Sequence, residues 1–238
     1  MTRLLFREDP YLRDAEGRVV AHTPEGGIVL DASIFYPKGG GQPGDSGRIG
    51  WHGGGVSIAT AVPGEAGDVV LVPAEPVALP AVGTYVTQRL DWERRHRHMR
   101  VHSALHLLTV VIPLPVTGGA IAAGSGRLDF AMPDAPEDRD QIETALNALV
   151  DRDLVISEDW IDEPVLDANP GLVKTMTVQP PRGRGPVRLV RIGAGRDQVD
   201  LQPCGGTHVA RTGEIGSLRL GKIENKGRQN RRVSILLD

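Results

Sequence analysis

Cysteine and aromatic residues are scarce in this chain. Its 238 residues include a single cysteine, Cys204, and aromatic side chains make up only 4% of the sequence. A lone cysteine cannot form an internal disulfide, which excludes a secreted scaffold held together by disulfide bonds. Because large aromatic rings are few, the core must be built mainly from Val, Leu, Ile and Ala side chains.

Long hydrophobic runs are missing as well. The longest, residues 104–116, contains His106 and two prolines and is too short to cross a bilayer. The N-terminal segment MTRLLFREDP carries charged side chains and contains no apolar core of a secretion signal. We therefore expect a soluble cytoplasmic protein with no membrane partner.

Charge is nearly balanced but unevenly distributed. The formal net charge is -3, which argues against the whole chain being a nucleic-acid binder. Acidic residues outnumber basic ones up to Gln88, whereas the later basic residues are concentrated in three runs, 94–100, 182–191 and 226–232. These runs could form a local face that holds phosphates, or they are ordinary solvated surface.

Glycine and proline are abundant, with 30 and 18 residues. They interrupt short apolar segments in the first part of the chain, such as 18–31, 69–73 and 84–91. Several short strands separated by frequent turn signals predict a small β-barrel. The proline-rich segment 73–83 marks the boundary region, and we divide the chain into a glycine-rich β-barrel domain, 1–88, and a second domain, 89–238.

The second part mixes helices and strands. Apolar spacing predicts a helix over 101–112 and a second one over 134–153, which Asp134 would cap. The buried stripe of the second helix is expected to be Ile142, Leu146 and Leu149. Strands are predicted at 124–130, 154–161, 186–193, 216–225 and 231–238, with the last two paired across the basic turn 226–230. This mixture predicts an α+β fold rather than a doubly wound sheet.

Two pairs of potential metal ligands share the same spacing. His102 and His106 lie four residues apart in the first predicted helix, so both imidazoles face the same side of it. Cys204 and His208 have the same separation, but Pro203 and two glycines favour a loop there. Imidazoles and a thiolate from separated segments are a usual zinc ligand set. Histidines on an apolar helix face are more often satisfied core residues, and spacing alone leaves both interpretations open.

Other histidines and motifs match known site types less well. A peptide-cleaving zinc helix needs a glutamate directly after its first histidine, and this chain has Ser103 there. His96 and His98 lie among arginines, whose charge disfavours a bound cation, so we expect a solvated basic segment. The glycines at 39–41 let a backbone approach a ligand, but they lack the Gly-Lys-Ser/Thr of a phosphate loop. A tight loop between barrel strands is the favoured interpretation of these glycines.

Taken in order, several motifs resemble those of a single family. The segments GGGQPGDSG, HSALHLL, GRLDF, CGGTHV and TGEIG, followed by a basic turn and a last strand, are similar to the editing domain of alanyl-tRNA synthetases. More specifically, the chain resembles the free-standing alanyl-tRNA editing proteins, the AlaX family, from about Gly27 onward. The resemblance implies an N-terminal small β-barrel followed by an α+β editing core with a zinc site.

The same resemblance implies the site residues. The Zn²⁺ ligands would be His102, His106, Cys204 and His208. The glycine-rich loop would border the aminoacyl pocket, with substrate-binding residues Ser33, Gly39, Gly40, Gly41 and Gln42. Because a catalytic zinc ion keeps an open position, we expect one of the four ligands, with His208 as the candidate, to bind loosely.

The resemblance also implies an activity. The protein would act in trans on tRNA, as a zinc-dependent deacylase that hydrolyses Ser-tRNA(Ala) or Gly-tRNA(Ala). Two positions depart from the family pattern: Ser33 replaces a threonine, and Ala122 lies near the place of a glutamine. Two alternatives are a zinc-stabilised RNA-binding module without turnover and an enzyme that edits seryl-tRNA(Thr).

Overall fold

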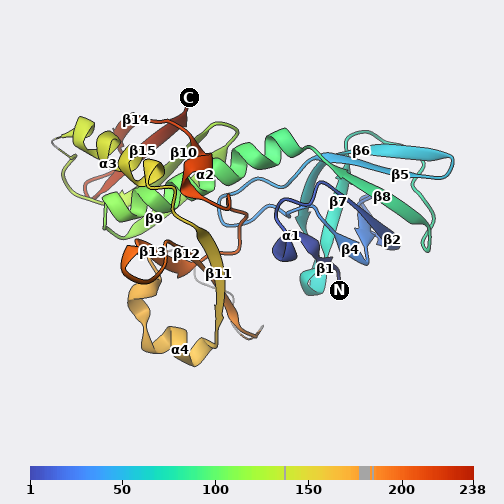
Figure 1. The fold of residues 1–238 in the computed structure, drawn as a ribbon. Coiled ribbons are helices and arrows are strands. Elements are labelled where there is room, and N and C mark those ends of the chain that lie inside the picture. Colours follow the sequence, from blue (N-terminus) through green and yellow to red (C-terminus); the bar gives the residue numbers. More distant parts are fainter. Residues whose placement is uncertain (137, 177–182, 184) are drawn as a thin grey trace. The chain divides into compact units, whose positions relative to one another are not determined.

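The computed structural model describes residues 1–136, 138–176, 183 and 185–238. The chain forms two compact units, Met1–Arg97 and His98–Asp238 (Figure 1). They contain the barrel and the mixed helices and strands that the sequence predicts, so the α+β class is confirmed. The domain boundary expected after residue 88 stays a prediction.

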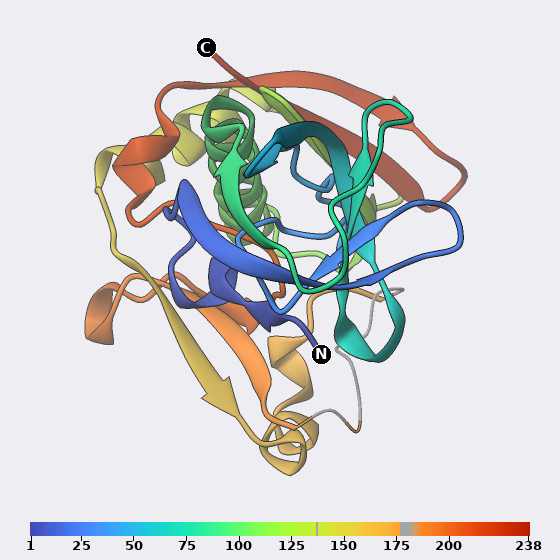
Figure 2. The ribbon, with the colours of Figure 1, turned by 90° about the vertical axis from the view of Figure 1, so that its right-hand side faces the viewer.

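The first unit, whose residues are all described, is built around a closed barrel (Figure 2). Each strand is antiparallel to its neighbours, in the order β2 (Asp14–His22), β3 (Ile28–Leu30), β7 (Val69–Pro73), β6 (Gly54–Pro63), β5 (Gly47–Trp51) and β8 (Tyr85–Leu90). The side chains of β8 alternate between exposed and buried, as a half-buried strand requires. The predicted barrel and its predicted strands are therefore confirmed.

Aliphatic side chains form most of the core of this unit, together with Phe6, Phe35 and Tyr36. A short parallel pair lies beside them, β1 (Arg3–Leu4) and β4 (Ala32–Ser33). Two helical turns complete the unit, α1 (Leu5–Glu8) and η1 (Glu65–Gly67).

The glycine-rich segment forms a tight turn in the loop between β4 and β5. Gly39 and Gln42 exchange two backbone hydrogen bonds, with N–O distances of 3.1 and 2.9 Å. Gly40 and Gly41, which lie between them, have φ angles of 55° and 83°. Positive φ at both central residues is the geometry of a type I′ turn, which glycine adopts without steric cost. The consecutive glycines therefore have a structural explanation.

A buried ion pair anchors the C-terminal part of this loop. Arg95 and Asp45 are 0% and 1% exposed, and the guanidinium binds both carboxylate oxygens. Arg95 also donates to the backbone oxygens of Pro10 and Ile34, at 2.9 and 2.7 Å. The Asp45 carboxylate accepts a further hydrogen bond of 2.6 Å from the Tyr36 amide. Both charges are thus paired and hydrogen-bonded, as burial requires.

The prediction that the basic segment 94–100 is solvated was wrong for part of it, because Arg97 is exposed but Arg95 and His98 are buried. The segment belongs to helix α2 (Trp92–Val111), which begins well before the predicted helix 101–112. Arg95, His98 and Met99 are buried, because a helical spacing of three and four residues places them on the same side. His96 is half-buried and stacks on Trp92, with ring centroids 5.2 Å apart.

The described part of the second unit contains two antiparallel sheets. One has the strand order β14 (Leu218–Asn225), β15 (Asn230–Leu237), β10 (Ser125–Ala131) and β9 (Val116–Ala122). The other has the order β11 (Ile156–Ile161), β12 (Val187–Ile192) and β13 (Asp200–Pro203). All strands predicted in this part are present, and β14 pairs with β15 across the basic turn as expected.

Helix α3 is shorter than predicted. It spans Arg139–Asp151, and its N-cap is Asp138 rather than Asp134, because the Asp138 carboxylate accepts a hydrogen bond from the Gln141 amide. Its buried stripe is Ile142, Leu146 and Val150, so Val150 takes the place that was predicted for Leu149.

Shorter helical segments were not predicted from the sequence. They are α4 (Glu163–Ala168) and the 3₁₀ turns η2 (Pro170–Leu172), η3 (Gly195–Asp197) and η4 (Thr212–Ile215). In the described part of the chain, no helix is both long enough and apolar enough to cross a bilayer.

Helix α2 packs closely on the four-stranded sheet at Gly126 of β10. A methyl carbon added to Gly126 would lie 2.6 Å from Cγ1 of Val101 and 3.2 Å from Cδ1 of Leu105. Such distances are shorter than van der Waals contact, so a larger residue at position 126 would force the Val101 or Leu105 side chain, or α2 itself, to shift. The small size of Gly126 therefore makes room for the Val101 and Leu105 side chains of α2.

Several arginines of the other basic runs are engaged in internal ion pairs. In the run 182–191, residues 182 and 184 lie outside the described part, and Arg188 and Arg191 each pair with an acidic residue of β11. In the run 226–232, Arg232 pairs with Asp129 of β10 at 2.7 Å. These three arginines stabilise the sheets and do not form a free phosphate-binding face.

We expect Arg95→Ala to destabilise the protein strongly. Removal of the guanidinium leaves the buried Asp45 carboxylate without its counter-charge, which costs about 3–5 kcal/mol in the free energy of unfolding. Urea denaturation followed by tryptophan fluorescence measures the effect. The matched control is Arg97→Ala, an exposed arginine of the same helix, which should change the free energy by less than about 0.5 kcal/mol. Equal losses in the two variants would contradict the role of the ion pair.

Candidate metal centre

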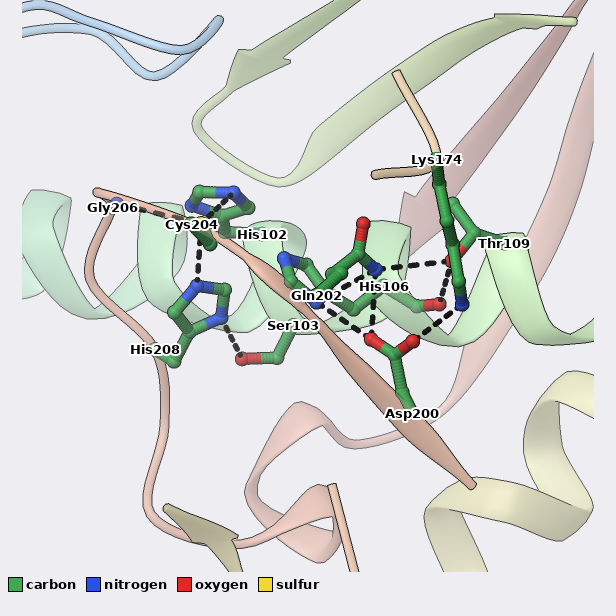
Figure 3. A network of polar contacts seen from close by, with 10 residues as sticks. All are labelled: His102, Ser103, His106, Thr109, Lys174, Asp200, Gln202, Cys204, Gly206 and His208. Atoms are coloured by element: carbon green, nitrogen blue, oxygen red, sulfur yellow. Dashed lines mark hydrogen bonds and ion pairs between the residues drawn. The ribbon is translucent and has the colours of Figure 1, made fainter. Parts of the chain in front are cut away.

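Four potential metal ligands meet in the second unit. His102 and His106 come from α2, and Cys204 and His208 come from the loop that follows β13. Their ligand atoms all lie within 4.8 Å of one another. The three imidazoles are between 5% and 8% exposed, and Cys204 is half-buried. The structure thus brings together the four residues that the sequence singled out (Figure 3).

The spacing of these atoms suits a zinc ion. The Cys204 sulfur lies 3.4 Å from Nε2 of His102 and 3.2 Å from Nε2 of His208. A tetrahedral site with one Zn–S and one Zn–N bond has an edge of about 3.6 Å between the two ligand atoms. The centroids of the three imidazole rings are 4.3 to 5.4 Å apart. Nitrogen and thiolate donors in this arrangement form a set that zinc prefers in proteins.

The loop that carries Cys204 is held by Arg188 of β12. The guanidinium donates to the carbonyl oxygens of Cys204 and Gly206, at 2.6 and 2.9 Å, and it pairs with Glu158 of β11. The Cys204 amide donates back to the Arg188 carbonyl at 3.2 Å. The Gly206 amide points at the Cys204 sulfur, at 3.4 Å, and so stabilises a thiolate. The loop predicted for this segment is confirmed.

A serine orients one of the imidazoles. Nδ1 of His208 lies 3.2 Å from the hydroxyl of Ser103, which also accepts a hydrogen bond of 3.2 Å from the Val209 amide. Ser103 is fully buried on α2. A partner on Nδ1 fixes the tautomer and the orientation of a metal-binding imidazole and leaves Nε2 for the ion.

A carboxylate orients a second imidazole. Nδ1 of His106 lies 2.9 Å from Oδ2 of Asp200 on β13 (Figure 3). The Asp200 side chain is fully buried, and it also accepts hydrogen bonds from Gln202, at 2.8 Å, and from Lys174. Gln202 and Lys174 each lie 3.2 Å from the hydroxyl of Thr109. A carboxylate behind a metal-binding imidazole is a frequent arrangement in zinc proteins.

Electrostatics favour the metal-binding forms of two of the candidate ligands, Cys204 and His208. Burial by itself would raise the pKa of Cys204, but His102 and His208 hold that pKa well below its usual range. The thiolate, which is the form that binds metals, is therefore accessible at neutral pH. Burial and the nearby His102 lower the pKa of His208 to about 3, which leaves this imidazole neutral.

Within the pair of His106 and Asp200, the pKa of the imidazole is raised and the pKa of the carboxyl group is lowered. Burial would lower the pKa of His106, but the hydrogen bond to Asp200 and the nearby Cys204 raise it to about 9. Burial would raise the pKa of Asp200, but the hydrogen bond from His106 and the charge of Lys174 lower it to about 2. A metal ion that binds His106 would therefore displace a proton from this imidazole.

The sequence did not single out the residues around Asp200. A signal for two of them exists, because Asp200 and Gln202 precede Cys204 by even numbers of residues in an extended segment, which places the three side chains on one face. Lys174 has no comparable signal, since it lies in an irregular segment and reaches the site only in the folded chain.

The predicted substrate-binding residues belong to the first unit. Ser33 and Gln42 are both 0% exposed, and the Ser33 hydroxyl accepts a hydrogen bond of 3.2 Å from the Phe35 amide. The glycines at 39–41 form the tight turn described above. The contribution of these residues to substrate binding stays a prediction.

We expect Ser103→Ala to weaken metal binding. The variant removes the hydroxyl that orients His208, so the zinc affinity should fall about 10-fold, the lower end of the effect of losing such a partner. Competition with a coloured chelator at neutral pH measures the affinity.

The control for this variant is Ser157→Ala, which changes an exposed serine of β11 and should leave the zinc affinity at the wild-type value. If Ser103→Ala also binds zinc with wild-type affinity, the hydroxyl does not orient a ligand.

Part of the chain matches a described protein family. Residues 187–234 match the family of the "Threonyl and Alanyl tRNA synthetase second additional domain". This range contains Cys204 and His208 and the arginine that holds their loop, Arg188.

Similar proteins align with nearly the whole chain. The alanyl-tRNA editing protein AlaX-M of Pyrococcus horikoshii is 34% identical over 245 aligned positions, which cover 100% of this chain and 99% of that protein. The protein of the same name from Methanosarcina acetivorans is 30% identical over 247 positions, with the same coverage. The alanine–tRNA ligase of Pyrobaculum arsenaticum is 34% identical over 235 positions, which are 94% of this chain but 25% of the ligase. The similarity therefore extends over both units.

Proposed function

The chain belongs to the family of alanyl-tRNA editing proteins, and on this premise we propose that it hydrolyses mischarged Ser-tRNA(Ala) or Gly-tRNA(Ala) in trans. The bond to be cleaved is the ester between the wrong amino acid and the tRNA. The cluster of three histidines and one cysteine carries the proposal, because it offers a site for a hydrolytic metal ion. The expected cofactor is Zn²⁺, and the expected partner is tRNA.

The residues of the cluster have defined roles in this proposal. Zinc, when bound by His102, His106, Cys204 and His208, would supply Lewis acidity to the ester carbonyl or to a water molecule. Asp200 and Ser103 hold two imidazoles in a fixed orientation, and Arg188 holds the loop of Cys204. Because an aminoacyl ester is already labile, modest activation suffices.

A catalytic zinc ion also needs a position for water or substrate. Four equally strong protein ligands would fill a tetrahedral site. We therefore propose that His208 binds the ion most weakly and can be displaced by water or substrate. Two observations support this choice. His208 lies on a loop, whereas His102 and His106 lie on α2. In addition, its orienting partner is the neutral hydroxyl of Ser103, whereas His106 has a carboxylate, which makes an imidazole a stronger ligand.

Ser33 is the proposed determinant of amino-acid selection. Its hydroxyl accepts one hydrogen bond from the Phe35 amide. A hydroxyl that accepts in this way still has its own proton to donate. We propose that Ser33, which is buried in this structure, becomes accessible on substrate binding and donates to the hydroxyl of a seryl group, a contact that a glycyl group cannot make.

We expect Cys204→Ala to abolish most of the deacylation of Ser-tRNA(Ala). Loss of a ligand should lower the rate by about 100-fold or more, since loss of an outer partner alone lowers metal affinity or activity by up to about 100-fold. Release of labelled serine from Ser-tRNA(Ala) measures the rate, before and after chelation and after zinc is restored. His52→Ala is the control, because His52 is an exposed histidine of the first unit.

A panel of mischarged tRNAs separates this function from its alternatives. Preferential hydrolysis of Ser-tRNA(Thr) would assign the protein to threonyl-tRNA editing. Binding of tRNA without turnover, combined with unfolding on chelation, would favour a zinc-stabilised RNA-binding module. Hydrolysis that survives both Cys204→Ala and chelation would refute the role of zinc.

We expect Ser33→Ala to slow the hydrolysis of Ser-tRNA(Ala) about 10-fold and to spare Gly-tRNA(Ala). The difference corresponds to about 1.4 kcal/mol, which is within the range of one hydrogen bond. The kcat/KM values for both substrates are measured in parallel, with Ser57→Ala, an exposed serine of β6, as the control. Equal losses on both substrates would indicate a folding defect and not a loss of recognition.

A further inference from the structure

Lys174 lies beside the metal centre without being one of its ligands. It follows the η2 turn, and its side chain is 25% exposed. Its own backbone and that of Met176 are attached to β9: the Val116 amide donates to the Lys174 carbonyl at 2.9 Å, and the Met176 amide donates to the Val116 carbonyl at 2.8 Å. The lysine side chain therefore extends from a fixed point of the backbone.

The ammonium group of Lys174 connects two elements of the site. It forms an ion pair with Oδ1 of Asp200 on β13 and donates to the Thr109 hydroxyl of α2 at 3.2 Å (Figure 3). The other carboxylate oxygen, Oδ2, lies 2.9 Å from His106 and accepts from Gln202 at 2.8 Å. Because different donors bind the two oxygens, the plane of the carboxylate is fixed.

Burial makes the charge of Lys174 important. The Asp200 side chain is 0% exposed, so its negative charge is costly unless donors and a counter-charge surround it. His106, as a neutral metal ligand, contributes a hydrogen bond but no charge, and Gln202 is also neutral. Lys174 is therefore the counter-charge of Asp200 among the residues that bind it in the described part of the chain.

We propose that Lys174 is a positioning residue of the metal centre. It holds Asp200 against His106 and thereby fixes the direction of His106 Nε2, and it acts through Asp200 and not as a ligand. The inference rests on the metal site of the proposed function, but it concerns the geometry of that site and can be tested without tRNA.

The experiment compares three lysine variants of the full chain. Lys174→Met removes the ammonium at nearly constant length, Lys174→Arg keeps a cationic donor, and Lys222→Met removes an exposed lysine of β14 as the matched control. Zn²⁺ and Co²⁺ affinities are measured by chelator competition, and the visible spectrum of bound Co²⁺ reports the ligand geometry. We expect Lys174→Met to lower both affinities about 10-fold and to change the Co²⁺ bands. Lys174→Arg should restore most of the affinity, and Lys222→Met should match the wild type.

A double-mutant cycle tests whether Lys174 acts through Asp200. Asp200→Asn should lower metal affinity about 10-fold to 100-fold by itself. If the lysine acts through this carboxylate, adding Lys174→Met to Asp200→Asn should lower the affinity no further. Fully additive losses would overturn the proposal.

Three further results would also overturn the proposal. The first is wild-type affinity and an unchanged Co²⁺ spectrum in Lys174→Met. The second is a wild-type chain that binds neither ion. The third is unfolding of both Lys174→Met and Lys174→Gln under conditions in which Lys174→Arg is folded, because the lysine would then have a general structural role. Urea denaturation of each variant separates this case from a specific loss of affinity.

The proposed function can fail independently of this inference. A chain that shows the expected metal responses but hydrolyses no mischarged tRNA would refute the deacylase activity and leave the role of Lys174 supported. If the wild type hydrolyses Ser-tRNA(Ala) but Lys174→Met binds metal as tightly as the wild type, the deacylase activity is supported and the role of Lys174 is refuted.

Discussion

The hydrogen bond between His106 and Asp200 joins helix α2 to strand β13, and the geometry of the candidate metal centre depends on it. Helix α2 carries two of the four candidate ligands, and β13 leads directly into the loop that carries the other two. Since Asp200 and Cys204 belong to the same short segment, this bond sets the register between the helix and the loop. Two further contacts maintain that register along the loop. Ser103 accepts a hydrogen bond from the Val209 amide, and Arg188 donates to the carbonyl oxygens of Cys204 and Gly206.

Several arginines of this protein form ion pairs and hydrogen bonds within the fold and do not extend freely into solvent. Arg95 compensates a buried carboxylate in the barrel unit, and Arg188 ties a ligand-bearing loop to a sheet. The guanidinium group of arginine is planar and donates hydrogen bonds in several directions, so each of these side chains binds one carboxylate and two carbonyl oxygens. Runs of basic residues in the sequence therefore do not by themselves indicate a surface for RNA. The relation of this chain to tRNA rests on its family, not on its charge.

The sequence predicts the parts of this structure that depend on local patterns. The strands of the barrel, the hairpin of β14 and β15 and the helical pair His102 and His106 follow from spacing and from turn residues. What local patterns miss are contacts between distant segments. The burial of Arg95 depends on Asp45, fifty positions away, and polar composition alone suggested solvent exposure. Asp138, and not Asp134, is the N-cap of α3 because its carboxylate accepts a hydrogen bond from the Gln141 amide. Lys174 reaches the site through contacts with Asp200 of β13 and Thr109 of α2, both far from it in the sequence.

The contact at Gly126 gives a residue without functional groups an influence on the chemistry of the site. The side chains that touch its position, Val101 and Leu105, directly precede His102 and His106 in α2. The helix cannot move outward at those two residues without carrying both imidazoles with it. The absence of a side chain at position 126 therefore bears on the position of two candidate metal ligands. A substitution at position 126 can therefore disturb the candidate metal centre, although Gly126 contributes no ligand atom to it.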